Sequence, residues 1–214
     1  MPSRSEGLRA DAARNRELIL SAARTVFAEQ GLGASMRQIA ARAGVGEPTL
    51  RRRFASKEDL VAEAFEDKIT VYADLARDAL DEPEPGEGLF LFLEQVARMQ
   101  LVDRGFAAVL TMTFPKSMRC EQERRRAFGT IQRLVTRAQE AGTLRQDFVT
   151  EDIVMLLLSH AGVVAGSGAL AEQFSARLLA YARDAVTAPG PRPLPPAPSP
   201  ARVYKTLMGL HETR

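Results

Sequence analysis

The sequence has few of the residues that most catalytic and metal sites use. Its 214 residues include one cysteine, Cys120, two histidines and no tryptophan. A single cysteine excludes an intramolecular disulfide and is typical of a reducing compartment. His160 has only His211, in the tail, as a second imidazole, so we expect no metal site. There is no Ser/His/Asp or Cys/His set and no phosphate-binding glycine loop, so we expect neither an enzyme nor a cofactor.

Long apolar runs are also missing. No stretch approaches the roughly 18 apolar residues that a transmembrane helix requires. Residues 1–20 carry charges with no long apolar stretch after them, which does not resemble a signal peptide. The overall composition, 45% hydrophobic and 26% charged, is ordinary for a soluble globular protein. We therefore expect a cytoplasmic protein that makes no contact with a membrane.

Sustained β-type alternation is absent too, and nearly all the periodicity is helical. In the first segment, apolar residues recur at the spacing of one helical face: Leu18, Ile19, Ala22, Ala23, Val26 and Phe27. The sequence therefore predicts an all-α fold, a three-helix head followed by a helical body. We expect helices at about 12–30, 36–43, 47–53, 57–80, 87–102, 103–113, 117–141, 151–166 and 170–186.

Two proline-rich stretches suggest how the chain is divided. The segment "DEPEPGEG", residues 81–88, interrupts the helical pattern and marks a domain boundary. We predict a head at 1–56, a connecting fourth helix at 57–80 and a body at 81–188. The segment "PGPRPLPPAPSP" then opens a tail, 189–214, that is polyproline-II-like or disordered.

The charge is concentrated at one end of the chain. The whole sequence carries a net charge of only +2. Residues 1–60 contain 11 Lys and Arg against 7 Asp and Glu, whereas the remainder is slightly acidic. A basic head on a nearly neutral body predicts an anionic partner for the head alone.

The stretch "SMRQIAARAGVGEPTLRRRF", residues 35–54, predicts a helix-turn-helix. Ser35 and Gln38 have the spacing of a capping box, Gly44 suits a helix C-cap, and Pro48 is tolerated in a first turn. The second helix is short enough to enter a DNA major groove. Its three arginines, residues 51–53, point about 100° apart, so they serve phosphates and at most one base edge. The alternative is an ordinary solvated helix surface.

Residues 19–65, "ILSAARTVFAEQGLGASMRQIAARAGVGEPTLRRRFASKEDLVAEAF", closely resemble the N-terminal domain of the TetR family of bacterial transcriptional repressors. The resemblance implies a homodimer on a near-palindromic double-stranded operator. It implies phosphate contacts from Ser35, Arg37 and Lys57, with the start of the second helix nearest the bases. The predicted DNA-binding set is Ser35, Arg37, Gly46, Glu47, Pro48, Thr49, Arg51, Arg52, Arg53 and Lys57.

The arginine run departs from the family pattern, which usually has Tyr, any residue and His before the Phe. A Tyr hydroxyl makes one neutral hydrogen bond to phosphate, whereas Arg makes charge-assisted and often bidentate ones. We therefore expect a steeper salt dependence than a Tyr/His version shows.

The body is rich in Met and Phe, which is typical of plain core. In a body resembling the TetR type, part of such a core holds a small-molecule inducer, and Met suits irregular space. His160 is expected to be a core or interface residue, or a ligand contact. The candidate pocket set is Phe90, Met99, Phe106, Leu110, Met112, Phe114, Met118, Phe128 and His160.

The last two predicted helices, 151–166 and 170–186, resemble the pair through which the family dimerises. Small residues such as Gly162 and Gly166 allow close helix approach, although a buried intrachain helix has the same pattern. We expect a ligand-released homodimeric repressor. A ligand-independent architectural dimer and an activator of the same fold remain alternatives.

Overall fold

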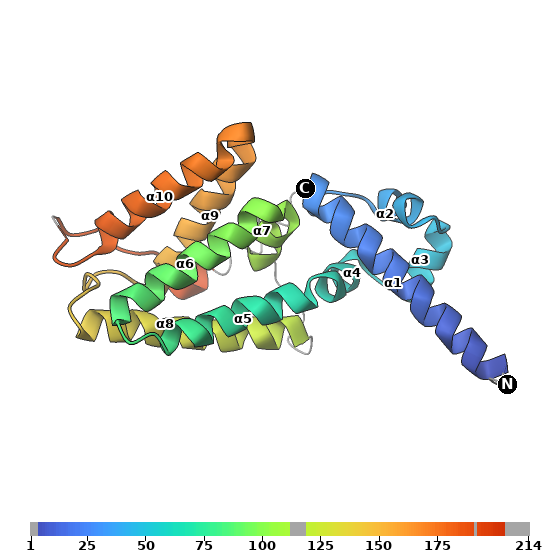
Figure 1. Cartoon of the computed structure of the whole chain (residues 1–214), viewed down its shortest axis with the longest axis horizontal. Helices are drawn as coiled ribbons and strands as arrows, with labels where there is room; N and C mark the ends of the chain where they lie inside the picture. Colours follow the sequence, from blue (N-terminus) through green and yellow to red (C-terminus); the bar gives the residue numbers. More distant parts are fainter. Residues whose placement is uncertain (1–3, 112–118, 191, 204–214) are drawn as a thin grey trace.

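The computed structural model describes residues 4–111, 119–190 and 192–203. In these parts the regular secondary structure is helical, and the only β pairing is one isolated bridge between Leu144 and Thr187. Figure 1 shows α1 to α3 as a small unit at one end and α5 to α10 as a larger bundle, with α4 between them. The predicted all-α fold is confirmed. The helices are α1 (Arg4–Gln30), α2 (Met36–Ala43), α3 (Glu47–Arg53), α4 (Lys57–Ala64), α5 (Glu66–Leu80), α6 (Pro85–Val102), α7 (Arg104–Thr111), α8 (Arg119–Glu140), α9 (Thr150–Ser167) and α10 (Ala171–Val186).

The head is built on the buried stripe of α1. Ile19, Ala23 and Phe27 are fully buried there and share one core with α2 and α3. Leu18, which we expected on the same face, is 59% exposed, so that expectation was wrong. Successive helical residues lie about 100° apart, which places Leu18 outside the stripe centred between Ile19 and Ala23.

The connection between head and body is two helices, not the single helix predicted for 57–80. The helix is interrupted at Phe65, whose φ of −108° and ψ of 4° lie outside the helical range. The Phe65 side chain is fully buried, and its ring centroid lies 6.0 Å from that of Phe27. The break lets α4 pack against α1 in the head while α5 packs against α6 and α8 in the body.

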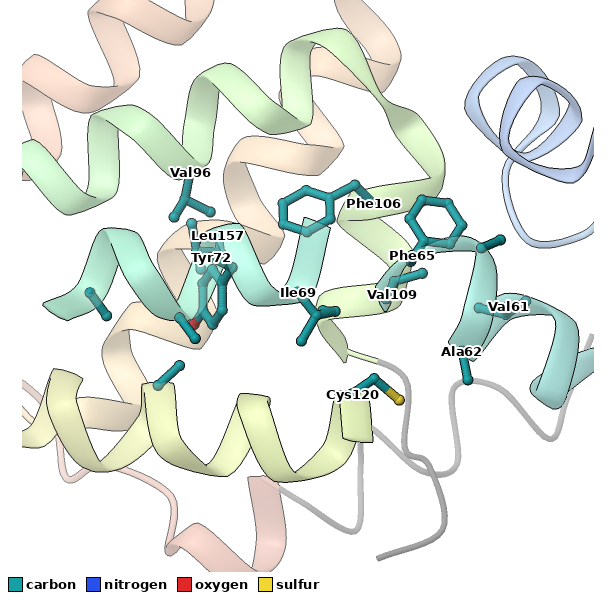
Figure 2. Packing of buried hydrophobic residues seen from close by; sticks show 14 of the residues in the cluster. Val61, Ala62, Phe65, Ile69, Tyr72, Val96, Phe106, Val109, Cys120 and Leu157 are labelled. Atoms are coloured by element: carbon teal, nitrogen blue, oxygen red, sulfur yellow. The ribbon is translucent and has the colours of Figure 1, made fainter. Parts of the chain in front are cut away.

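The core of the body lies between α5, α6, α7 and α8. Figure 2 shows Ile69 and Tyr72 of α5 facing this space together with Val96 of α6 and Phe106 of α7. All four side chains are buried. α9 packs against α6 and α7 on one side of this core, and α10 packs against α9 and α6. The body therefore has an inner bundle and an outer helix pair.

The beginning of the tail is held against the body. The Leu194 N–H donates to Asp147 Oδ2 at 2.7 Å, and Arg145 Nη2 donates to the Arg192 carbonyl at 2.5 Å. Arg145 also donates to the Ala185 carbonyl at 3.0 Å. Arg145 Nε donates a further hydrogen bond to Asp147 Oδ1. This bond, together with the one from the Leu194 N–H, holds the pKa of Asp147 well below its usual range. A buried arginine thus fixes a stretch in which the sequence suggested only polyproline II or disorder.

Candidate nucleic-acid interface and cavity

Ser35 and Gly44 bound the first helix of the helix-turn-helix. Ser35 Oγ accepts from the Gln38 N–H at 3.2 Å, and Gln38 Oε1 accepts from the Ser35 N–H at 2.8 Å. Gly44 takes the left-handed conformation with φ +68°, which glycine adopts without steric cost. α3 then begins at Glu47 with Pro48 in its first turn. The predicted capping box and both helix bounds are confirmed.

α3 is fixed to the core of the head by Leu50 and by its C-cap residue Phe54, which are 0% and 2% exposed. The Arg16 guanidinium of α1 lies 4.6 Å from the centroid of the Phe54 ring, and Arg16 Nε donates to Glu63 Oε1 of α4 at 2.6 Å. Arg16 therefore ties α1 to α4 at the end of α3. The sequence reasoning missed this residue, because its partners lie far away along the chain and no local pattern marks them.

The three arginines of α3 are exposed and have different surroundings. Arg51 Nε donates to Glu47 Oε1 at 2.9 Å, one turn back on the same helix. Arg52 Nη2 donates to Thr49 Oγ1 at 3.1 Å. Arg53 instead lines a surface recess, whose wall also includes Arg16 of α1 and Glu63 of α4. Among the described residues no ion-pair partner is found for Arg52 or Arg53.

The other predicted DNA contacts lie at the turn and at the two flanking helix starts. Ser35, Arg37, Gly46 and Pro48 are exposed, whereas Glu47, Thr49 and Lys57 are half-buried. Burial lowers the pKa of the Lys57 ammonium, which opens α4. The structure therefore leaves the polar groups of this set accessible to a partner at the α2–α3 turn.

A cavity of about 420 Å³ lies between α6, α9 and α10. Its wall is largely apolar, with side chains from all three helices. The volume falls within the range of small-molecule sites in proteins. The apolar wall includes Phe90, Leu93, Ala97, Leu157, Leu179 and Val186.

Of the predicted pocket residues, Phe90 and His160 line this cavity. Leu110 and Phe128 line a separate space of about 50 Å³ against Tyr72. Neither space is lined by Met99 or by Phe106, which is fully buried in the core. The remaining three, Met112, Phe114 and Met118, lie outside the described residues.

A chain of buried polar groups crosses the wall of the larger cavity. His160 Nδ1 lies 2.6 Å from Gln100 Oε1, and His160 Nε2 lies 2.7 Å from Ser175 Oγ. Burial lowers the pKa of His160. The sequence reasoning missed Gln100 and Ser175, because they come from α6 and α10 and only the fold brings them to His160. In the described parts of the chain, no group of three His, Cys, Asp or Glu side chains is placed to hold a metal ion.

A capped helix-turn-helix with a basic, exposed second helix above an all-α body defines a DNA-binding regulator. Two family models match the chain. Residues 19–64 match "Bacterial regulatory proteins, tetR family", and residues 84–187 match "Transcriptional regulator SbtR-like, C-terminal domain". The chain belongs to the TetR family, whose members are non-enzymatic DNA-binding transcription factors.

Several solved structures are similar to the chain. The TetR transcription regulatory protein from Mycobacterium vanbaalenii is 34% identical, over 85% of this chain and 99% of its own, with a TM-score of 0.48. SmeT, the repressor of the Stenotrophomonas maltophilia multidrug efflux pump SmeDEF, is 22% identical over 84% and 97%, with a TM-score of 0.56. FadR from Bacillus subtilis, in complex with stearoyl-CoA, is 19% identical over 76% and 97%, with a TM-score of 0.53. No curated protein matches the chain.

Proposed function

We propose that the protein is a homodimeric repressor that binds a near-palindromic operator and leaves it when a small molecule fills the cavity between α6, α9 and α10. The observation that carries the DNA-binding part is the exposed basic face of α3. Three arginines with three different surroundings suit a helix lying between two phosphate backbones. Its place of action is the cytoplasm, where the DNA of a bacterium lies.

The contacts around α3 support a division of labour at the operator. Ser35, Arg37 and Lys57 bind phosphates beside the groove, and residues 46–49 lie nearest the base edges. Arg51 and Arg52 are already held by side chains of their own helix. Holding them before DNA arrives lowers the side-chain entropy lost on binding.

The outer face of α9 and α10 supports the dimer. Met155, Phe174 and Tyr181 are 56%, 44% and 60% exposed. Contrary to the expectation from the sequence, the span Thr150–Val186 contains an apolar stretch long enough to cross a membrane, and only 22% of that stretch is buried within the protomer. In a DNA-binding regulator, a second copy of the same pair is the cover that fits such a surface. Sedimentation at micromolar protein tests this, and a monomer, or partition into lipid vesicles, contradicts it.

The position of the cavity supports release by a ligand. α6 and α9 line it, and both pack against α7, which in turn packs against α1 of the head. A ligand that prefers the released form of the dimer therefore shifts the population away from DNA. The repressor SmeT and the stearoyl-CoA complex of FadR, which have this fold, support the sign of regulation and a ligand with a long apolar chain.

The test is operator binding by the full chain. DNA flanking its own gene is titrated with protein, a footprint locates the site, and a scrambled duplex is the control. We expect a protected near-palindrome and an affinity of about 10⁻⁸ M or tighter. Weak and equal binding to both duplexes contradicts the repressor and favours the architectural dimer. A footprint upstream of a promoter that the protein stimulates identifies an activator.

A further inference from the structure

The larger cavity has one buried polar patch in an otherwise mostly apolar wall. The patch joins three helices: Gln100 comes from α6, His160 from α9 and Ser175 from α10. The three residues are 2%, 2% and 3% exposed. Because His160 and Ser175 line the cavity, the directions of their hydrogen bonds decide what the cavity offers to a ligand.

The carbonyl of Leu157 fixes the orientation of the Gln100 amide. Gln100 Nε2 lies 3.2 Å from the Leu157 carbonyl oxygen. A carbonyl only accepts, so the amide NH₂ must face it, and Gln100 Oε1 is left to face His160. The opposite orientation would place two acceptor oxygens against each other in a buried site.

The Gln100 oxygen then fixes the tautomer of His160. Gln100 Oε1 is an acceptor, so His160 Nδ1 carries the proton and donates across the 2.6 Å contact. A neutral imidazole with a proton on Nδ1 has an unprotonated Nε2, which accepts. Burial lowers the pKa of His160 and so favours this neutral form at pH 7.

The direction of the last bond follows. The Ser175 hydroxyl lies 2.7 Å from His160 Nε2, so it must donate its only proton to that nitrogen. For any other partner, the Ser175 hydroxyl can offer only the lone pairs of its oxygen. The Ser175 side chain in the cavity wall is therefore an acceptor and not a donor.

Four charged side chains line the wall, two of them acidic and two basic. Arg183 is already engaged, paired with Glu87 and stacked 4.6 Å from the ring centroid of Phe90. Glu94, Glu172 and Arg98 also line the cavity, and no ion pair is found for any of the three among the described residues. The charges of the wall therefore balance, and the acceptor role of Ser175 follows from its hydrogen bonds alone.

We propose that the cavity binds a mainly apolar molecule that carries one hydrogen-bond donor, a hydroxyl or an amine, and that Ser175 Oγ accepts from this donor. The proposal rests on the proposed function, because it names the ligand class of the same site. Molecules of the same shape without a donor make no hydrogen bond to Ser175 Oγ and therefore bind more weakly. The two donor classes differ in charge: Glu94 and Glu172 favour the amine, whereas Arg98 opposes it.

The test measures binding of three probes with the same decyl chain to the full-length protein by calorimetry. The probes are 1-decanol, decylamine and decyl methyl ether, and the ether lacks a donor. We expect 1-decanol or decylamine to bind roughly three- to tenfold more tightly than the ether, the worth of one net hydrogen bond. A tighter amine assigns the carboxylates to a cationic ligand, and a tighter alcohol assigns Ser175 to a neutral one. An ether that binds as tightly as both overturns the proposal, as does failure of all three to bind.

Variants separate the hydroxyl from the shape of the cavity. Ser175→Ala should reduce the ratio between donor and ether to near one, and Ser175→Thr should keep it. Ser159→Ala is the matched control, because Ser159 is exposed on α9 and, among the described residues, its hydroxyl is found bonded to the Met155 carbonyl alone. Circular dichroism and thermal unfolding check that each variant folds. A ratio that persists in folded Ser175→Ala overturns the assignment of Ser175.

Operator release is measured separately, so that the two proposals fail independently. If the donor probes bind with the expected preference but leave the operator complex intact, the ligand class stands and release by ligand fails. If the operator is bound specifically but no probe enters the cavity, the DNA-binding role stands and the ligand class fails.

Discussion

In the head, the three arginine side chains of α3 are exposed to solvent, whereas in the body Gln100, His160 and Ser175 are buried and bonded to one another. Exposed charges pay little desolvation cost. Because they lie in solvent, salt screens their attraction to an anionic partner. Buried polar groups are costly unless each finds its partner. The head therefore relies on accessible charge, and the body on fixed hydrogen-bond directions.

The two regions meet in a buried apolar contact that is flanked by one ion pair. Phe65 lies against Phe27 of the head, and Gly105 of α7 approaches both of them. Beside them, Asp103 is paired with Lys68 and accepts from the Phe106 N–H at 3.0 Å. Because α7 packs against α6, α9 and α1, the proposed release by a ligand requires this tightly packed junction to couple body and head, and the first predictions test the junction.

Phe65→Ala should have the largest effect. The side chain is fully buried between head and body, and removing a buried Phe costs about 3–5 kcal/mol. Urea unfolding followed by circular dichroism should show this loss, and a second transition if head and body separate. Leu18→Ala is the control, because Leu18 is 59% exposed and should change the free energy of unfolding by under about 0.5 kcal/mol. Equal losses in the two variants contradict a packed junction.

Gly105→Ala should act on the same junction with a smaller effect. A Cβ at residue 105 would lie 2.8 Å from both the Phe27 carbonyl oxygen and the Phe65 ring. Overpacking of this kind costs about 1–3 kcal/mol. Gly129→Ala is the matched control, because a Cβ there meets nothing within 4 Å in the middle of α8.

The two alanine variants should therefore differ in sign. Gly129→Ala should raise the free energy of unfolding by about 0.5–1 kcal/mol, since Ala is the better helix former. Thermal unfolding of both variants measures the difference. We also expect Gly105→Ala to weaken ligand release more than operator binding itself. A destabilised Gly129→Ala, or a neutral Gly105→Ala, contradicts this reading of the junction.

The head could be predicted closely from the sequence because its signals are local. The Ser35–Gln38 box, Gly44 and Pro48 each act within a few residues, and the structure confirms the helix bounds they predict. The break at Phe65 was missed, because the helical pattern continues through it and only the fold supplies Phe27 and Gly105.

The cavity was harder to predict for the same reason. Composition pointed to Met and Phe, yet the polar end consists of residues from three helices separated by 15 and 60 positions. No spacing rule links Gln100 to His160 or His160 to Ser175. The predicted Phe90 and His160 line the cavity, whereas Phe106 is plain core. A Met/Phe-rich composition does not distinguish a pocket from packing.

Arg51→Tyr sharpens the comparison at the DNA surface. Replacing a charged phosphate contact by a neutral one should reduce the slope of log K against log salt by about one, with a modest loss of affinity. Operator titrations at several salt concentrations measure the slope. Arg133→Tyr, an exposed arginine of α8, is the control and should leave it unchanged. An unaltered slope in Arg51→Tyr means that this arginine does not neutralise a phosphate.

Cys120 gives the smallest effect and tests the buried side of the comparison. Its side chain is 3% exposed, and burial raises the pKa of the thiol to about 11. In the unfolded chain the thiol ionises near pH 8.5. The folded protein therefore keeps the thiol protonated between these values. The stability that this provides is present below about pH 8.5 and is lost as the pH rises toward 11.

Only the thiolate attacks a disulfide reagent, so at pH 8 the folded protein should react far more slowly with 5,5′-dithiobis(2-nitrobenzoate) than the urea-unfolded chain. The chain has one cysteine, so the absorbance reports this site alone. Equal rates would mean that the thiol is accessible and ionised. The junction of α8 with the α4–α5 connection, where Figure 2 shows Cys120 near Ala62, would then be open to solvent, unlike the buried core of the body.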